Sequence, residues 1–387
     1  MNIKELDKTY IENTYTRFPL VAESGRGARV TGENGQTYID LGSGIAVDSF
    51  GACDEEWVSA VTEQLHKIQH FSNLFYTEPQ VKLAQMLCER TGMQKVFFGN
   101  SGAEANECAI KCARKYSFDK YGAERSNIIT LQNSFHGRTL ATLTATGQDA
   151  LHPDCFAPYP GGFLYTPADD FTALEALCDG TVCAVMMELV QGEGGVLPLD
   201  RDFVQQTAKL CRERDILLII DEVQTGNGRT GALYAYQQYA VDPDIVTTAK
   251  GLGGGLPLGC CIFGGKAEGT LTAGTHGSTF GGNPVCCAGA ISILSRIDGK
   301  LLADVRTKGE FIRSELSGAA GVKSVTGLGL MLGIETEKNA KSIADACLAR
   351  GVVVLTAKNK VRLLPPLNIA WEELRQAIQI LKGVIAE

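Results

Sequence analysis

The chain has 387 residues, of which 44% are hydrophobic and 21% are charged, and its formal net charge is −8. This composition is ordinary for a globular protein and excludes a disordered chain. The acidic balance argues against nucleic acid or an anionic membrane surface as a partner. No run reaches the ~18 uncharged apolar residues that a membrane span requires, so no membrane partner is expected. At about 150 residues per domain, the length predicts two or three domains.

Thirteen cysteines, an odd number, cannot all be paired in disulfides. Many lie in apolar runs, where a reduced thiol behaves as a small hydrophobic side chain. The first ten residues carry charges of both signs and no apolar core, so no signal peptide is expected. We therefore expect a reducing compartment and a cytoplasmic location. No histidine is spaced to share a metal with Cys108 and Cys112, and no cysteine has a nearby histidine or helix-opening cation in its sequence context, so neither a metal site nor a thiol enzyme is expected.

The first predicted element is a hairpin over residues 28–40, because Asn34-Gly35 is a favoured two-residue turn. Amphipathic helices are expected over 54–69 and 79–90. Five short apolar runs then alternate with helical segments, a pattern that is typical of a parallel sheet covered on both faces. The runs are 96–98, 128–131, 184–187, 216–220 and 245–246, and helices are predicted at 102–118, 171–178 and 202–214. Ligands bind such sheets beyond the carboxyl ends of the strands.

After about residue 297 the pattern changes to helices around short strand-like runs. This predicts a smaller α+β domain, which the N-terminal hairpin could complete because chain ends often meet. The predicted helices are 299–316, 338–350 and 371–386, and the strand-like runs lie near 322–334 and 352–355. Residues 327–333 resemble a dinucleotide fingerprint, but the glycine spacing differs and no helix follows directly. No P-loop string is present.

The polar clusters after the apolar runs are the candidate sites. Ser101 and Glu104 form a capping box, and the small residues Gly102 and Ala103 leave helix N–H groups open to a phosphate. The alternative is merely a well-capped helix. In the next cluster, Phe135 could stack on a ring and Arg138 could bind a carboxylate, unless 134–139 is an ordinary polar loop.

Three further charged residues stand in contexts that favour a ligand. Glu193 lies among glycines at 191–195, which could also be a simple turn. Asp221 ends an apolar strand, where an ionised carboxylate invites a cationic partner, although it could instead cap the next helix. Lys250 lies in an almost uncharged, glycine-rich stretch, so burial would lower its pKa and make it a nucleophile. The alternative is a surface lysine.

Pyridoxal 5'-phosphate (PLP) satisfies these clusters together, because it needs a lysine, an acidic partner for its ring nitrogen and a phosphate cradle. Lys250, Asp221 and the Gly102–Ala103 turn supply these groups. Phe135 could then stack on the ring and Gln224 could hydrogen-bond the ring oxygen, which leaves Arg138 for a substrate carboxylate.

The chain resembles the class III (subgroup II) PLP-dependent aminotransferases, most closely their acetylornithine branch. The motifs that carry the resemblance cover nearly the whole chain: NSGAEANE (100–107), SFHGRT (134–139), QGEGGV (191–196), DEVQTGNGRTG (221–231), TTAKGLGGG (247–255), THGSTFGGNP (275–284) and RLLPPL (362–367). It implies a fold-type I α/β protein with a mostly parallel seven-stranded sheet. A large PLP-binding domain would span 51–286, and residues 1–50 with 287–387 would form a discontinuous small domain.

The resemblance also implies roles for individual residues. Lys250 would bond the cofactor and later move a proton, and Asp221 would keep the ring nitrogen protonated. Arg138 would hold the substrate α-carboxylate, and Glu193 would pair with Arg362 to gate which carboxylate binds. The remaining residues expected to bind cofactor or substrate are Glu222, Val223, Tyr15, Ser278 and Thr279, the last two reaching into the neighbouring subunit's site of a homodimer.

The implied reaction moves the terminal amino group of N-acetyl-L-ornithine to 2-oxoglutarate, a step of arginine biosynthesis. Succinylornithine, N-succinyl-diaminopimelate, ornithine and 4-aminobutyrate remain alternative donors, because acyl preference is worth only ~1–3 kcal/mol per methylene. A non-catalytic binding protein on this fold is the alternative from another class. One departure from relatives is Gly51-Ala-Cys-Asp54, where a G-H-x-H-P-like string is common. We expect it to affect a local turn or a subunit contact.

Overall fold

The computed structural model describes residues 2–387. Its largest sheet has seven strands in the order β4-β12-β11-β10-β7-β5-β6, and only β12 runs antiparallel to its neighbours. The strands are β4 (Lys95–Gly99), β12 (Gly259–Phe263), β11 (Ile245–Thr248), β10 (Leu217–Asp221), β7 (Val182–Met187), β5 (Asn127–Leu131) and β6 (Phe163–Thr166). The expected mostly parallel, seven-stranded α/β fold is therefore confirmed.

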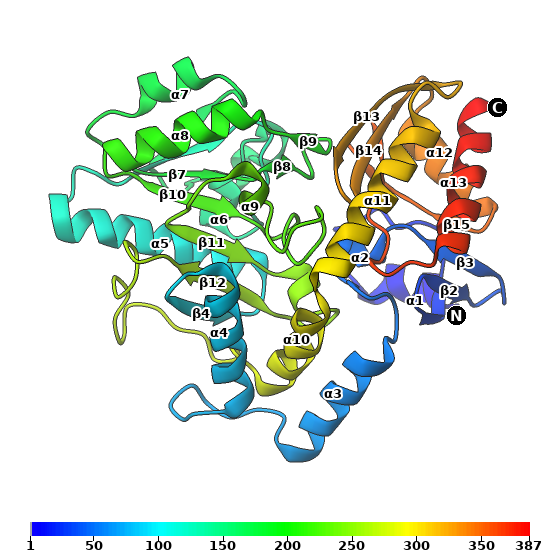
Figure 1. Cartoon of the computed structure of the whole chain (residues 1–387), viewed down its shortest axis with the longest axis horizontal. Coiled ribbons are helices and arrows are strands. Elements are labelled where there is room, and N and C mark those ends of the chain that lie inside the picture. The colour runs from blue at the N-terminus through cyan, green and yellow to red at the C-terminus, as the bar shows by residue number, and fades with distance from the viewer. Residues whose placement is uncertain (1) are drawn as a thin grey trace.

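Five of these strands coincide with the predicted apolar runs, whereas β6 and β12 were not predicted from the pattern. Helices pack on both faces of the sheet (Figure 1). They are α3 (Glu55–Lys67), α4 (Glu78–Thr91), α5 (Gly102–Tyr121), α6 (Leu140–Ala145), α7 (Phe171–Leu177), α8 (Arg201–Glu213), α9 (Tyr236–Tyr239) and α10 (Pro284–Arg296). Helix α5 packs against five of the strands, and most of its buried side chains are small, among them Ala105, Cys108, Ala109, Cys112 and Ala113.

The rest of the chain forms two four-stranded sheets beside the large one (Figure 1). One contains β1 (Ala22–Arg26), β2 (Arg29–Gly32), β3 (Thr37–Asp40) and β15 (Val352–Val353); the other contains β13 (Val322–Leu328), β14 (Met331–Thr336), β17 (Lys360–Leu363) and β16 (Leu355–Ala357). Three helices pack with these two sheets: α11 (Gly299–Leu316), α12 (Ala340–Ala349) and α13 (Trp371–Ala386). Strand β3 pairs in parallel with β15, so the N-terminal hairpin does join the C-terminal part. Residues 327–333 form the turn and flanks of the β13–β14 hairpin, which rules out the dinucleotide fingerprint.

Short elements complete the chain: α1 (Ile3–Tyr10), α2 (Ser43–Ala46), β8 (Val190–Gln191), β9 (Leu197–Pro198) and the 3₁₀ turns Asp149–Leu151, Asp154–Phe156 and Lys250–Leu252. The divergent segment that begins at Gly51 makes a sharp turn, in which Gly51 has φ +83° and a Cβ there would lie 2.4 Å from the backbone of Gly27. Asp54 then caps α3 and pairs with Arg296 at 2.7 Å. Within residues 2–387, no helix is long and apolar enough to cross a membrane.

Candidate active site

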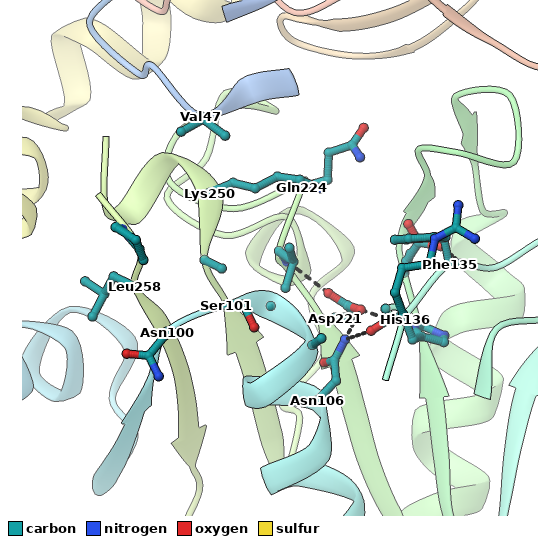
Figure 2. Close-up of a pocket in the computed structure, with 18 of the residues that line it drawn as sticks. Val47, Asn100, Ser101, Asn106, Phe135, His136, Asp221, Gln224, Lys250 and Leu258 are labelled. Atoms are coloured by element: carbon teal, nitrogen blue, oxygen red, sulfur yellow. Dashed lines mark hydrogen bonds and ion pairs between the residues drawn. The ribbon is translucent and has the colours of Figure 1, made fainter. Parts of the chain in front are cut away.

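A cavity of about 450 Å³ opens where the loops that follow β4, β5, β7, β10 and β11 meet. It lies beyond the carboxyl ends of the parallel strands, as the sequence predicted for a ligand site. Figure 2 shows side chains from these separate loops converging on it, with Lys250 and Asp221 both among its lining residues.

The N-terminus of α5 forms one wall of the cavity. Ser101 accepts a hydrogen bond from the backbone N–H of Glu104 at 3.1 Å, and the Glu104 carboxylate accepts one from Asn100 N–H at 2.7 Å. Gly102 and Ala103 line the cavity directly. A Cβ on Gly102 would lie 2.7 Å from Val223, so only glycine lets these two loops approach. Exposed N–H groups at this helix end are suited to an anion such as a phosphate.

Asp221 sits at the end of β10 with a 3% exposed fraction, and its carboxylate is held by three donors. Asn106 Nδ2 and His136 Nδ1 each lie 2.8 Å from Oδ2, and the backbone N–H of Val223 donates to Oδ1 at 3.0 Å. The hydroxyl of Thr247 in turn donates to Asn106 Oδ1 at 2.6 Å. These contacts fix the carboxylate facing the cavity, as the dashed lines of Figure 2 show.

Lys250 is the buried amine of the site. Burial lowers the pKa of its ammonium, and the nearby carboxylates of Glu193 and Asp221 counteract this only in part. A lowered pKa increases the fraction of neutral, nucleophilic amine near neutral pH. The backbone of Lys250 has φ +45°, a region that non-glycine residues rarely occupy.

The aromatic ring and guanidinium expected from the SFHGRT cluster both line the cavity. The Arg138 guanidinium carbon lies 5.4 Å from the centroid of the Phe135 ring. Arg138 is exposed and, among residues 2–387, makes no ion pair. Its planar group is therefore available for a carboxylate from outside the chain.

Glu193 and Arg362 form an ion pair with 2.5 Å between Oε1 and Nη1. Burial raises the pKa of Glu193, but the Arg362 guanidinium outweighs that effect and holds it below its usual value. Neither residue lines the cavity, yet Gln224 does, and its amide lies 3.4 Å from Glu193 and 3.5 Å from Arg362. The Gln224 side chain thus lies between the Glu193–Arg362 pair and the cavity.

Besides Glu193 and Arg362, four predicted site residues are not among those that line the cavity. Tyr15 lies on the surface with 71% of its area exposed, and Thr279 is also exposed. Ser278 accepts a hydrogen bond from Asn100 of the same chain at 3.1 Å. The Glu222 carboxylate is enclosed in the core, where it accepts from the Tyr236 N–H at 2.8 Å, and burial raises its pKa to about 7.

The cavity residues that the sequence did not single out as site residues include Asn106, His136 and Glu188. Glu188 is fully buried and accepts hydrogen bonds from the N–H groups of Phe135 and Gly192, and burial raises its pKa to about 7. It directly follows the last residue of β7, so its position beyond a parallel strand was the available signal.

The fold gives Cys108 neighbours that its sequence context does not show. A hydrogen bond with Cys261 lowers the pKa of the Cys108 thiol against the effect of burial, and His276 adds to the shift. His276 is distant in sequence, so the contact is made only by the fold. Cys108 is completely buried and does not line the cavity, and all thirteen cysteines are free.

Comparisons with known proteins define the class. Residues 10–385 match the family model for class-III aminotransferases, so the chain belongs to this family. It is 50% identical to an acetylornithine aminotransferase of Haemophilus ducreyi over 388 aligned positions, covering 100% of this chain and 98% of the relative.

Solved structures agree with this assignment. An N-acetylornithine aminotransferase from Stenotrophomonas maltophilia has a TM-score of 0.86 and 36% identity, covering 99% of this chain and 98% of that one. The ornithine aminotransferase of Toxoplasma gondii has a TM-score of 0.94 at 31% identity, with coverages of 99% and 94%, and one structure of it contains PLP at partial occupancy in the active site.

Proposed function

We propose that this chain transfers the terminal amino group of N-acetyl-L-ornithine to 2-oxoglutarate, giving N-acetyl-L-glutamate 5-semialdehyde and L-glutamate. The observation that carries the proposal is the buried Lys250 amine in one cavity with the fixed Asp221 carboxylate and the open N-terminus of α5. The 50% identity to an acetylornithine aminotransferase over the full chain supports this donor over the other candidates.

The donor set of the cavity fits PLP. The N–H groups at Gly102 and Ala103 suit its phosphate, Asp221 suits a protonated ring nitrogen, and the Phe135 ring can cover one face. Val223 and Gln224 complete the wall, and Glu222 would contribute by holding its loop. When bound, PLP supplies an electron sink for the carbanion that transamination requires.

The protein's own residues then have distinct tasks. Lys250 would hold the cofactor through its side-chain amine and, once free, would move the proton of the substrate carbon as general base and acid. Asp221, whose carboxylate is buried and faces the cavity, would keep the ring nitrogen protonated. Arg138 holds the substrate α-carboxylate with its unpaired guanidinium.

The Glu193–Arg362 pair explains how two different substrates can use one cavity. While Glu193 neutralises Arg362, a single-carboxylate donor has only Arg138 to bind. A dicarboxylic acceptor such as 2-oxoglutarate offers a second carboxylate, which can compete with Glu193 for Arg362. Gln224 contacts both members of the pair and lines the cavity, so it links this exchange to the ligand.

We also propose a homodimer in the cytoplasm, with Tyr15, Ser278 and Thr279 completing shared active sites. Leu74 and Tyr76 are 86% and 98% exposed, and Phe280 is 60% exposed. Asn73 ties these two segments together through hydrogen bonds to the carbonyls of Ser278 and Gly281 at 3.1 and 2.7 Å. Such an ordered apolar surface beside the cavity is suited to a second copy. Light scattering should give twice the chain mass.

An absorption spectrum tests the function directly. A visible band of the purified protein should bleach with N-acetyl-L-ornithine and return with 2-oxoglutarate, and Lys250→Ala should abolish this cycle. A band that ignores N-acetyl-L-ornithine would move the donor to succinylornithine, N-succinyl-diaminopimelate, ornithine or 4-aminobutyrate. No band after addition of PLP would favour a non-catalytic binding protein.

A further inference from the structure

Lys250 occupies a strained backbone conformation at the start of a 3₁₀ turn, in which the carbonyls of Ala249 and Lys250 accept from the N–H groups of Leu252 and Gly253 at 2.9 and 3.0 Å. Its φ of +45° lies in the left-handed region, which is unfavourable for lysine because lysine, unlike glycine, has a Cβ atom. Such strain persists only where surrounding contacts hold it. The residues that hold this backbone therefore determine where the Lys250 amine can reach.

Two side chains hydrogen-bond to the carbonyls of the residues before and after Lys250. Asn227 Nδ2 donates to the carbonyl of Ala249 at 3.1 Å and lies 3.0 Å from the hydroxyl of Thr248. Ser49 Oγ donates to the carbonyl of Gly251 at 2.9 Å. Both side chains are almost completely buried, with exposed fractions of 3% and 2%, so neither hydrogen bond can be replaced freely by water.

The fit around this segment is close. A Cβ on Gly251 would lie 2.6 Å from Ser49 Oγ and 3.4 Å from Asn227 Cβ, so the two side chains enclose Gly251 from two directions. Asn227 itself has φ +56°, a conformation that asparagine tolerates better than most residues, and its Oδ1 is buried without a hydrogen-bond partner. The Asn227 amide group thus donates to the Ala249 carbonyl, while its own Oδ1 remains without a hydrogen bond.

The two residues belong to different parts of the site. Asn227 lies in the loop that begins at Asp221, and Ser49 follows the left-handed turn Ser43–Ala46. The Ser49 carbonyl also accepts from the N–H of Leu367 at 2.8 Å, in the segment that begins with Arg362. The Lys250 backbone is therefore anchored to the loop of the cofactor's acidic partner on one side and to the Arg362 segment on the other.

We propose that Ser49 and Asn227 are positioning residues that hold Lys250 in its left-handed backbone conformation, so that the amine is aimed at the cofactor's aldehyde. The proposal rests on the proposed role of Lys250. In that role the neutral amine adds to the aldehyde carbon, a C=N bond forms, and the aldehyde oxygen leaves as water with both amine protons. Neither Ser49 nor Asn227 lines the cavity, so they act through Lys250 and not on the ligand.

The test compares Ser49→Ala and Asn227→Gly with the wild type. Asn227→Gly keeps the left-handed backbone and removes only the amide. The matched controls are Ser117→Ala, a buried serine without a hydrogen-bond partner in the described chain, and Asn133→Gly, an exposed asparagine at φ +65°. PLP is added to the cofactor-free full-length protein. Its dissociation constant is measured by quenching of protein fluorescence, and bond formation is followed by the visible band.

The two variants should bind PLP within about twofold of the wild type but form the bond roughly tenfold more slowly, since small misplacements of a reacting group cost rate more than affinity. The pH midpoint of the visible band should shift, and kcat should fall with little change in KM. Asn227→Asp, which sets an acceptor against the Ala249 carbonyl, should be slower still. The controls should match the wild type.

Three results would overturn the inference: unchanged bond formation, an equal loss of PLP affinity and of rate, or the same loss in the controls. Failure of the proposed function gives a different signal. Borohydride treatment of the wild-type protein with PLP, followed by peptide mass spectrometry, should add the cofactor mass at Lys250. If Lys250 is unmodified in the wild type, its assigned role is wrong, irrespective of the variants.

Discussion

His136 and Asp221 share a hydrogen bond of 2.8 Å between Nδ1 and Oδ2, with both side chains almost completely buried. Asn106 joins them, because its amide donates to the same carboxylate oxygen and to the His136 carbonyl at 2.7 Å. The loop after β5, the helix α5 and the end of β10 are therefore linked at one carboxylate. This arrangement keeps a buried charge satisfied while it points at the cavity.

Removal of Asn106 should weaken cofactor binding. Asn106→Ala deletes the donors to Asp221 and to the His136 carbonyl and leaves the Thr247 hydroxyl without its acceptor. We expect a loss of about 1–3 kcal/mol in PLP affinity, the range for a broken buried hydrogen bond to a charged group. Fluorescence titration with PLP measures it. Asn106→Asp, which places a second carboxylate beside Asp221, should be worse; an affinity equal to the wild type in both variants would contradict the assigned role of Asp221.

Arg138 should affect substrate binding and not cofactor binding. It has no ion-pair partner in the described chain, so Arg138→Ala removes the contact to an incoming carboxylate and, within the chain, the contact over the Phe135 ring. KM for the amino donor should rise roughly a hundredfold, about 2.7 kcal/mol, while the visible band stays. Arg138→Lys should recover part of this loss, because it keeps the charge but not the two-pronged geometry. Loss of PLP from the alanine variant would show that the loop has been misassigned.

Glu193→Ala should release Arg362. The guanidinium loses the partner at 2.5 Å and becomes available to any carboxylate that reaches it. We expect KM for 2-oxoglutarate to fall severalfold, and discrimination against amino donors with two carboxylates to weaken. Kinetics with paired substrates measure both effects. Glu213→Ala, an exposed helical glutamate remote from the cavity, is the control; an unchanged KM for the acceptor would mean that the pair has no gating role.

Glu222 should contribute a measurable pH dependence to stability. Burial raises its pKa from 4.5 to about 7, so between these values the folded protein holds a proton that the unfolded chain has released. The contribution of Glu222 to the free energy of unfolding is therefore fully present below pH 4.5. It is lost as the pH rises toward 7, by up to about 3 kcal/mol. Glu222→Gln should remove this slope, apart from a constant cost for its altered hydrogen bonds. Urea unfolding across this pH range tests it, and parallel curves for the two proteins would contradict the prediction.

The sequence was sufficient for the parts of the fold that obey local patterns. The five apolar runs became strands because buried parallel strands are continuously hydrophobic, and α5 begins after Ser101 because the N-cap contact from Glu104 N–H to the Ser101 side chain is local. The predicted capping box is only half formed, because the Glu104 carboxylate accepts from the N–H of Asn100 and not from that of Ser101. Strand β12 was missed because its sequence, GCCIF, is short and follows a glycine-rich stretch. Its pairing with β11 is local, but its pairing with β4 joins residues more than a hundred positions apart in the sequence.

The site shows the same division between local and long-range signals. Lys250 and Asp221 stood out because charge is unusual in their surroundings. Asn106 and His136 did not, because an asparagine on a helix becomes a carboxylate donor only when β10 lies beside that helix. The proximity of Cys108 and His276 could not be predicted either, because the two residues are distant in sequence and only the fold brings them together.

The parallel pairing of β3 with β15 has a consequence for synthesis on the ribosome. Ile39 faces Val352, so the partner of the N-terminal hairpin emerges more than three hundred residues after it. The large sheet, in contrast, has its last strand once Phe263 has been translated. The hairpin consequently keeps an unpaired strand edge through most of translation. Chaperones should therefore bind nascent chains that are stalled after Phe263 and before Val352.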